Sequence, residues 1–208
     1  MKVQENVENL FPISDDIVIL SVIRKDEYRE YQKILCDNLS SMGRYFFSTN
    51  PNYVKELFGD LLKKESFYCT IREKVTHQFC GYCGIKDVDS SRPELAIELI
   101  KSMQHKGIGT HALKLLLQTY SLCEEFEYFT YIVAADNYPS QHLCEKIGGI
   151  PNRIVAFILK DPQLQEIFEE SNLHMINDHL RDVAKKFNVE PKKLLSHFLE
   201  YKILPKNK

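Results

Sequence analysis

The stretch "SMQHKGIGTHALKLLL" (residues 102–117) places Gly107 and Gly109 between a polar run and an apolar helical pattern. Glycine has no Cβ, so backbone N–H groups beside it can approach a ligand closely. A helix N-terminus adds unpaired N–H donors and partial positive charge, which suit a phosphate. The stretch therefore predicts a phosphate-binding loop that leads into a helix.

Two familiar phosphate-binding patterns fit this loop poorly. A P-loop is longer and ends in Lys followed by Ser or Thr, whereas Lys106 precedes the first glycine. A Rossmann fingerprint follows the first strand of its unit and precedes an acidic residue that binds ribose. Here three predicted strands come before the strand that leads into the loop, and no acidic residue suits that role, although Ala112 would be allowed in the motif. A strand-to-helix turn with incidental glycines is the remaining alternative.

Composition sets the broad class of protein. The 208 residues are 44% hydrophobic and 27% charged, which is ordinary for a globular protein with one full core. A formal net charge of −2 argues against nucleic acid as the main partner. Apolar runs stay well below the roughly 20 residues that span a bilayer, and the N-terminal residues do not read as a signal peptide. We therefore expect a cytoplasmic protein with no membrane partner.

The six cysteines suggest neither redox chemistry nor a metal site. Cys80 and Cys83 have the spacing of a redox pair, "CGYC". Such a pair normally opens a helix that lowers the thiol pKa, whereas "HQFCGYCGIKDV" (77–88) predicts an extended segment. We expect buried structural thiols. Too few His and Cys residues lie at ligand spacing for a zinc site, so no metal is expected.

Hydrophobic periodicity predicts alternating strands and helices. The expected strands are 15–24, 66–73, 78–88, 94–100, 127–137 and 153–160, and the expected helices are 25–46, 49–65, 108–122 and 139–149. Their order indicates an α/β domain with a mixed sheet. Residues 161–208 show no strand signal and predict about three helices. The expected organisation is a domain at 1–160 followed by a helical C-terminal extension at 161–208.

Two motifs in this order carry a family resemblance. They are "ELAIELIKSMQHKGIGTHALKLLL" (94–117), with Gln104, Gly107 and Gly109, and "VAADNYPSQHLCEKIGG" (133–149), with Asn137, Ser140, Glu145, Lys146 and Gly148. Together they resemble the GNAT superfamily of acyl-CoA-dependent N-acyltransferases over about residues 13–160. The opening "VILSVIRKDEYREY" (18–31) resembles the branch that contains ribosomal-protein N-terminal acetyltransferases. The resemblance implies a mixed, mostly antiparallel central sheet flanked by helices.

The resemblance also implies acetyl-CoA as cosubstrate and assigns a coenzyme site to both motifs. Backbone N–H groups of the loop would hold the pyrophosphate, and the pantetheine arm would pair with a strand edge at the gap where Asn137 ends the next strand. Lys146 would reach the coenzyme or remain a solvated lysine at a helix end. The residues assigned to the coenzyme are Leu99, Ile100, Lys101, Gln104, His105, Lys106, Gly107, Ile108, Gly109, Thr110, Asn137, Ser140 and Lys146.

Acetyl transfer to an amine needs a base, because the attacking nitrogen must first lose a proton. Strand alternation puts Glu94 and Glu98 on one face of an otherwise apolar strand, where carboxylates are costly to bury without a purpose. Glu94 stands where many family members carry a glutamate, so it is the first candidate base and Glu98 the second. Either could instead lie at a solvated strand end or pair with a lysine. A backbone N–H near Ile100 would polarise the thioester carbonyl.

The general acid is less clear, because this sequence departs from the family pattern. Cys144 stands where many members have a tyrosine that protonates the leaving thiolate, and Gly149 replaces the usual aromatic residue. Tyr138 is nearby but belongs to a different turn. A buried thiol is the favoured interpretation of Cys144. A leaving thiol with a pKa near 8.5 can depart without a strong acid.

The C-terminal tail allows two structural interpretations. Ala184, Val189 and Leu194 have helix-turn-helix spacing, with Lys185, Lys186, Lys192 and Lys193 able to meet phosphates. An amphipathic helical pair that packs on the core, or on a second subunit of a homodimer, is favoured.

We expect an N-acetyltransferase that acts on a small amine, an amino acid or a protein N-terminus. The alternatives are a non-catalytic acyl-CoA-binding or interaction module and a DNA-binding regulator.

Overall fold

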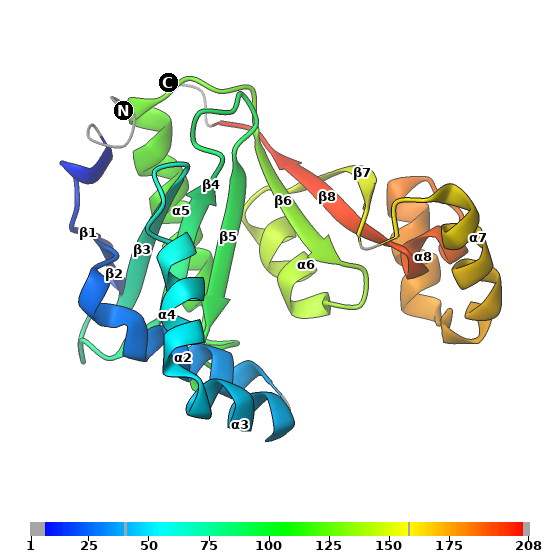
Figure 1. Ribbon diagram of the computed structural model, residues 1–208. Helices are drawn as coiled ribbons and strands as arrows, with labels where there is room; N and C mark the ends of the chain where they lie inside the picture. Colours follow the sequence, from blue (N-terminus) through cyan, green and yellow to red (C-terminus); the bar gives the residue numbers. More distant parts are fainter. Residues whose placement is uncertain (1–6, 40, 158, 206–208) are drawn as a thin grey trace. The chain divides into compact units, whose positions relative to one another are not determined.

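The computed structural model describes residues 7–39, 41–157 and 159–205. The described chain forms two compact units (Figure 1). The first contains the described residues up to Glu127 together with Pro205, and the second runs from Tyr128 to Leu204. In the part of the chain that the structure describes, no helix has the length and apolar character to cross a membrane.

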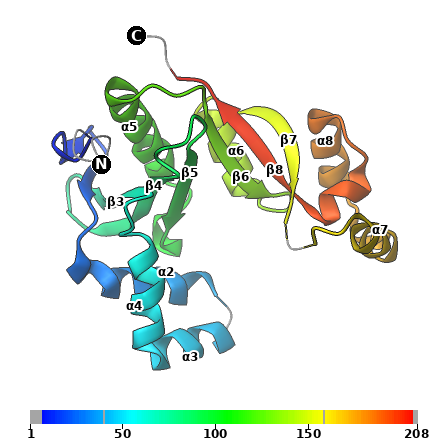
Figure 2. The same ribbon diagram turned by 45° about the horizontal axis from the view of Figure 1, so that its top comes forward.

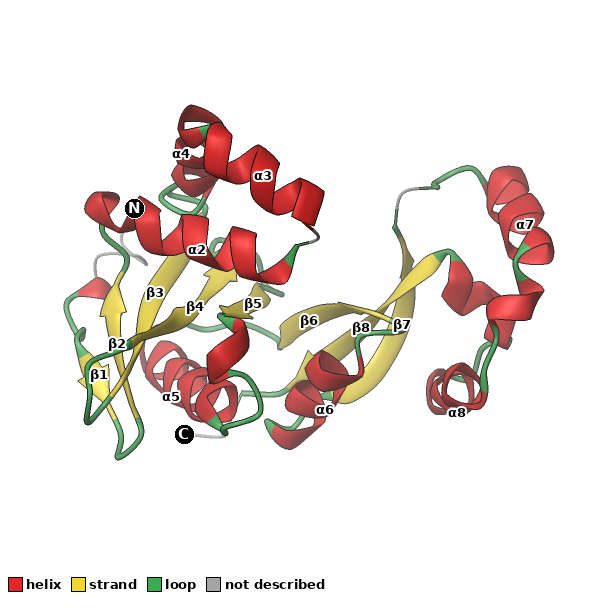
Figure 3. Cartoon of the chain, turned by 90° about the horizontal axis from the view of Figure 1, so that it is seen from below, coloured by secondary structure: helices red, strands yellow, loops and turns green. Residues whose placement is uncertain are grey.

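The first unit is an antiparallel sheet with helices on both faces. Its strands are β1 (Ile13–Ser14), β2 (Val18–Val22), β3 (Ser66–Glu73), β4 (Phe79–Lys86) and β5 (Glu94–Leu99), paired in that order. Its helices are α2 (Tyr28–Asn38), α3 (Ser41–Thr49), α4 (Pro51–Asp60) and α5 (Ile108–Cys123), with short 3-10 turns η1 (Lys25–Glu27) and η2 (Lys101–Met103). Helices α2 and α4 cover one face of the sheet, and α5 covers the other (Figure 3).

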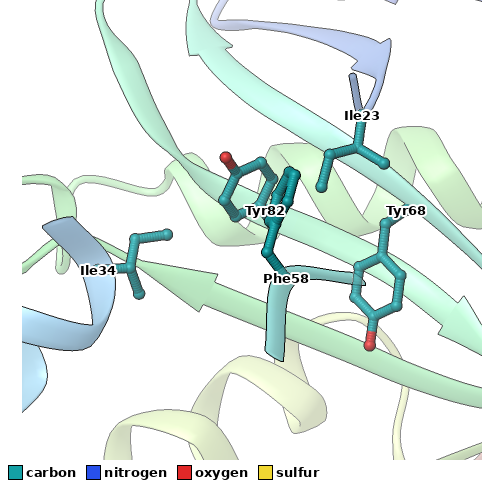
Figure 4. Close-up of a cluster of buried hydrophobic side chains, with 5 residues drawn as sticks. All are labelled: Ile23, Ile34, Phe58, Tyr68 and Tyr82. Carbon is teal, nitrogen blue, oxygen red and sulfur yellow. The ribbon is translucent and has the colours of Figure 1, made fainter. Parts of the chain in front are cut away.

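Burial in this unit follows from the two covered faces. The first six residues of β3 are all buried, because side chains on both faces of this strand meet a helix layer. Beneath α2 and α4 the core consists of Ile23, Ile34, Phe58, Tyr68 and Tyr82 (Figure 4). Pro51 occupies the first turn of α4, where its missing N–H costs nothing.

The second unit is a three-stranded sheet with helices around it. Its elements are β6 (Phe129–Ala134), α6 (Tyr138–Lys146), β7 (Ile150–Ala156), α7 (Pro162–Ser171), η3 (Leu173–Met175), α8 (Asp178–Phe187), η4 (Pro191–Leu195) and β8 (His197–Ile203). The strands run in the order β6-β8-β7, and both pairs are antiparallel. The α/β class and the mostly antiparallel pairing are thereby confirmed. The single helix expected at 25–46 is wrong, because this segment forms two helices, α2 and α3 (Figure 2), and the short strand β1 was not predicted.

The prediction of a purely helical segment from 161 to 208 is wrong. Its last described element, β8, is a strand that pairs on one side with β6 and on the other with β7. Leu199, Tyr201 and Ile203 are buried on this strand, which has a neighbour along both edges. Strand β7 lies before residue 160 and β8 lies after it, so both sides of the expected domain boundary contribute to one sheet. The strand expected at 153–160 also begins earlier, at Ile150, directly after the glycines that follow α6.

The cysteine pair is part of the sheet. Cys80 and Cys83 both lie on β4 and are fully buried, as the extended reading of "CGYC" predicted. Cys83 stands opposite Cys69 on β3, and all three thiols are free. Burial raises the pKa of each of these thiols, so they are poor nucleophiles.

Candidate active site

The glycine loop enters α5 through left-handed backbone conformations. Gly107 is the residue before the first turn of α5, with φ +81° and ψ −13°, and His105 also has a positive φ of 60°. The carbonyl of Gly107 accepts hydrogen bonds from the N–H groups of Thr110 and His111, at 3.0 and 3.1 Å, which closes the first turn. Alternating handedness of this kind turns successive N–H groups toward a common side, as in anion-binding nests.

The loop has the donors and the space that a pyrophosphate needs. Within the described residues, the backbone N–H groups of 105–109 donate to no protein acceptor. A Cβ added to Gly107 would have only one neighbour within van der Waals range, Cδ2 of His111 at 3.9 Å. The residues present therefore fit the phosphate-binding role. Gln104 anchors the loop, because its side-chain Nε2 donates to the carbonyl of Leu99 at 3.1 Å.

The structure distinguishes the backbone N–H groups near Ile100. The N–H of Ile100 donates to the carbonyl of Cys80 at 3.0 Å, so it is used in pairing with β4. Backbone groups alternate between the two edges of an antiparallel strand. The N–H of Leu99 therefore points toward the edge opposite β4. Of the N–H groups near Ile100, that of Leu99 is the remaining candidate for polarising the thioester, and this role stays a prediction.

The two glutamates of β5 share a face with α2 and α4 but differ in their partners. Glu94 stands opposite Lys86 on β4, and the lysine Nζ lies 2.6 Å from its carboxylate. The side chain of Glu94 is 21% exposed and that of Lys86 is 46% exposed. The lysine pairing that the sequence left open is the arrangement that the structure shows for Glu94.

Glu98 has the environment of a base. It lies between Ala96 and Ile100, two residues whose side chains pack on the buried cluster of Figure 4. Asn38, the last residue of α2, donates from Nδ2 to its carboxylate at 3.1 Å, and no cation pairs with it among the described residues. Burial raises the pKa of Glu98 above its ordinary value, and the hydrogen bond from Asn38 offsets only part of that rise. Asn38 lies 60 residues away in sequence, and no local pattern could have indicated it.

In the second unit, Asn137 and Ser140 organise the start of α6. The side chain of Asn137 caps this helix by accepting from the N–H of Ser140 at 3.2 Å. The hydroxyl of Ser140 hydrogen-bonds that of Tyr131 on β6 at 2.7 Å. Lys146 is exposed at the end of α6. Contacts of Asn137, Ser140 and Lys146 with the coenzyme stay predictions.

Cys144 and Gly149, the two departures from the family pattern, are in contact. Cys144 is fully buried, and a Cβ on Gly149 would lie 2.3 Å from its sulfur and 2.8 Å from its carbonyl oxygen. A larger residue at position 149 therefore requires the neighbouring atoms to shift. Burial raises the pKa of the Cys144 thiol to about 12, which makes it a poor proton donor. The ring of Tyr138 lies against that of His179 at a tilt of 50°, with ring centroids 3.7 Å apart, and its hydroxyl accepts from Asn177.

The tail does not form a helix-turn-helix. Helix α8 buries Leu180, Val183, Ala184 and Phe187, as expected of an amphipathic helix, but a 3-10 turn and a strand follow it in place of a recognition helix. The four lysines also have acidic partners: Lys185 with Asp182, Lys186 with Glu145, Lys192 with Glu170 and Lys193 with Glu169. Such paired lysines are poorly suited to binding DNA phosphates.

One continuous segment of the first unit thus carries a strand with a carboxylate of raised pKa and then a loop with unpaired N–H groups at a helix N-terminus. In the second unit, Asn137 and Ser140 tie a strand to the helix that follows it. Both features agree with the acyl-CoA-dependent N-acyltransferase class.

Comparison with known proteins agrees with that class. The family model for the acetyltransferase (GNAT) domain matches residues 18–150, and the chain belongs to this family. It is an acetyl-CoA-dependent N-acetyltransferase. No protein of curated function matches the sequence.

Solved structures of acetyltransferases share the fold. A Vibrio cholerae protein assigned as a ribosomal-protein-serine acetyltransferase is 14% identical, with a TM-score of 0.62, covering 94% of this chain and 98% of the other. RimL, a ribosomal L7/L12 alpha-N-protein acetyltransferase, is 10% identical, with a TM-score of 0.60 and coverage of 95% and 99%. The microcin C7 self-immunity acetyltransferase MccE, solved with acetyl-CoA and AMP, is 14% identical, with a TM-score of 0.59 and coverage of 91% and 93%. These likenesses show the fold.

Proposed function

We propose that the protein transfers an acetyl group from acetyl-CoA directly to an amine acceptor, with Glu98 as the base. The acceptor ammonium gives a proton to the Glu98 carboxylate, and the neutral nitrogen attacks the thioester carbonyl carbon. The C–N bond forms, the nitrogen gives up its second proton as the C–S bond breaks, and coenzyme A leaves as a thiolate that takes up that proton. The observation that carries this proposal is a partly buried Glu98 with a raised pKa and no cationic partner in the described part of the chain.

The loop and the end of β5 are proposed to hold the coenzyme. Backbone N–H groups of residues 105–109 bind the pyrophosphate at the start of α5, and the edge at Leu99 to Lys101 pairs with the pantetheine arm. The N–H of Thr110, which the sequence included in this group, is used in the first turn of α5. The N–H of Leu99 polarises the thioester carbonyl as negative charge develops on its oxygen. Asn137, Ser140 and Lys146 complete the coenzyme site in this proposal.

Glu94 is the weaker candidate for the base. Its carboxylate is already held by Lys86 at 2.6 Å, so an acceptor ammonium would have to displace this lysine to reach it. The leaving thiolate needs no strong acid, since a free thiol has a pKa of about 8.5. This agrees with the unsuitability of Cys144 as an acid.

The same proposal includes a cytoplasmic location and a homodimer formed through the C-terminal helices. Helix α7 supports the dimer, because Leu164, Ile167 and Phe168 are exposed on it while Gln165 and Glu169 are buried. A helix that presents its apolar side chains to solvent is typical of a surface that another chain covers. The solved neighbours act on different acceptors according to their titles, so the fold alone does not select among a small amine, an amino acid and a protein N-terminus.

Glu98→Gln tests the base. The variant should lose thiol release from acetyl-CoA by at least about 100-fold, the usual lower range for a lost general base, while calorimetry still detects acetyl-CoA binding. The wild-type kcat/KM should fall as the pH drops through the raised pKa of Glu98, and the residual activity of the variant should lack that limb. Thermal stability of the variant should rise at pH 7, because the fold disfavours the ionised carboxylate.

The matched control is Glu56→Gln, which removes an exposed charge from α4 and should change none of these readouts. Full turnover in Glu98→Gln would eliminate this residue as the base. Absence of thiol release from the wild-type protein with every amine tested would overturn the proposed activity.

A further inference from the structure

The sheet surface beneath α2 and α4 contains a row of residues that crosses three strands. Tyr68 on β3 stands opposite Gly84 on β4, which stands opposite Ala96 on β5. A Cβ on Gly84 would lie 2.4 Å from Cδ1 of Tyr68. The tyrosine ring therefore lies flat across β4 at the place where Gly84 has no side chain. Its hydroxyl end extends toward β5.

Glu94 and Glu98 flank Ala96 on this same face of β5. Four residues of strand separate their Cα atoms by roughly 13 Å at about 3.3 Å per residue. Both carboxylates act on the same tyrosine: burial raises the pKa of Tyr68, and the charges of Glu94 and Glu98 raise it further. The hydroxyl of Tyr68 thus lies within reach of the fields of both carboxylates.

Tyr68 is the unusual member of its cluster. It is only 8% exposed, yet its hydroxyl has no hydrogen-bond partner among the described residues. The hydroxyl of Tyr82, by contrast, donates to the carbonyl of Glu27 at 3.0 Å. Figure 4 shows the two hydroxyls pointing in different directions, with that of Tyr68 directed away from Ile23. Among the described residues, the fully buried side-chain polar atoms without a partner are His179 Nε2 and the hydroxyl of Tyr201. The hydroxyl of Tyr68 is therefore not fully enclosed, and it can bond a ligand at this face.

The charges around this strip favour a cation. Lys86 pairs with Glu94 and balances the charge of that carboxylate, whereas Glu98 has no cationic partner in the described chain. Lys55, the other cation near this face, lies over the ring of Tyr28 at 5.1 Å. The ring of Tyr31 also borders Glu98, whose charge helps burial to raise the tyrosine pKa to about 12. Carboxylates beside aromatic faces recognise ammonium groups, and they repel an acceptor that carries its own carboxylate.

We propose that the acceptor is a slender aliphatic amine with a second cationic group. The reacting ammonium binds at Glu98, the chain lies along the face beside Tyr68, and the second cation binds the carboxylate of Glu94 in competition with Lys86. Glu94 is then a specificity residue. This inference rests on the proposed function, with Glu98 as the base.

The test compares three families of linear acceptors with matched chain length: α,ω-diamines, monoamines and ω-amino carboxylates. Thiol release from acetyl-CoA gives kcat/KM for each. Diamines whose nitrogens lie roughly 8–13 Å apart, the span set by the two glutamates, should exceed the matched monoamines by at least about tenfold, which is the effect of one charge-assisted hydrogen bond. The ω-amino carboxylates should be the poorest.

Glu94→Gln should bring the diamine-to-monoamine ratio close to one, whereas the control Glu56→Gln should preserve it. Lys86→Met, which removes the internal competitor, should raise the ratio. Tyr68→Phe keeps the ring but loses the hydroxyl, and should lower diamine kcat/KM without preventing coenzyme binding.

Equal use of the three families, or an unaltered ratio in Glu94→Gln, would overturn this inference and leave the proposed activity intact. If acetyl-CoA binds but no amine releases thiol, the proposed activity and this inference both fail.

Discussion

Gly107 offers the sharpest test of the coenzyme loop, because its backbone conformation and its surroundings make separate predictions. At φ +81° a residue with a Cβ is strained, and the left-handed conformation costs an L-residue roughly 1–2 kcal/mol. Replacing glycine also restricts the unfolded chain, which returns about 0.4–1 kcal/mol. Gly107→Ala should therefore destabilise the free protein by about 1 kcal/mol. Steric overlap adds little, since the added Cβ would meet only His111 at 3.9 Å.

Two further variants separate strain from ligand access. Asn tolerates the left-handed region better than Ala, so Gly107→Asn should regain most of the lost stability while still projecting a side chain beside the unpaired N–H groups. Gly59→Ala is the control of opposite sign, because Gly59 lies inside α4 with no atom within 4 Å of an added Cβ. It should stabilise by about 0.5–1 kcal/mol, as Ala does in helix interiors.

The assays are chemical denaturation of the free protein and calorimetric titration with acetyl-CoA. Both Gly107 variants should weaken coenzyme binding by at least about tenfold, the equivalent of about 1.4 kcal/mol, and Gly59→Ala should leave it unchanged. Equal stability of Gly107→Ala and the wild type would refute the left-handed assignment. Wild-type affinity in Gly107→Asn would refute the phosphate cradle.

Three more predictions concern the second unit. Gly149→Ala should lower the free energy of unfolding by about 1–3 kcal/mol through overpacking. In a Cys144→Ala background the loss should be smaller but not zero, because the carbonyl contact at 2.8 Å remains. If urea unfolding shows the same loss with Cys144 present and in the Cys144→Ala background, the sulfur contact is contradicted. Burial alone would raise the pKa of Glu169, but hydrogen bonds from Lys193 and Ser196 outweigh it and the pKa lies below its usual value. This stabilisation is present above the unfolded pKa near 4.5 and is lost as pH falls through the lower folded pKa. The thermal stabilities of Lys193→Met and the wild type should therefore differ most near pH 7 and converge in acid. A difference in unfolding temperature that does not change with pH would exclude this linkage. Ile167→Glu should shift a dimer to monomer in sedimentation, and an unchanged distribution would remove α7 from the interface.

The hydrophobic pattern of the sequence correctly predicted elements such as β3 and the start of α5. Strand β3 begins and ends where the apolar run of 66–73 predicted, and α5 starts directly after the glycine loop. The pattern was insufficient for β8, because "SHFLEYKIL" (196–204) supports both a helical and a strand spacing of apolar residues. Pairing with β6 and β7 on both edges stabilises the strand, and a partner 40 or more residues away leaves no local signal.

The same limit applies within the candidate site. The alternation of 94–100 correctly placed both glutamates on one face, but the sequence could not rank them. Their difference lies in Lys86, brought opposite Glu94 by the β4–β5 register, and in Asn38, brought to Glu98 by the end of α2. Tyr68 gave no signal of its own, because its position depends on the absence of a side chain at Gly84.

These observations separate the reaction from its specificity. In the proposed function, Glu98, the N–H of Leu99 and the glycine loop follow one another along residues 98–110, so strand geometry and a helix N-terminus would place base, thioester and pyrophosphate in sequence. This segment can be predicted from the sequence, because its signals are local. The surface proposed for the acceptor, formed by Tyr68, Glu94 and Glu98, depends instead on the register of β3, β4 and β5 and on the position of α2. Taken alone, each of these residues could equally have a purely structural role. Mutations that change the acceptor should therefore fall mainly outside residues 98–110, whereas mutations inside that segment should impair every acceptor alike.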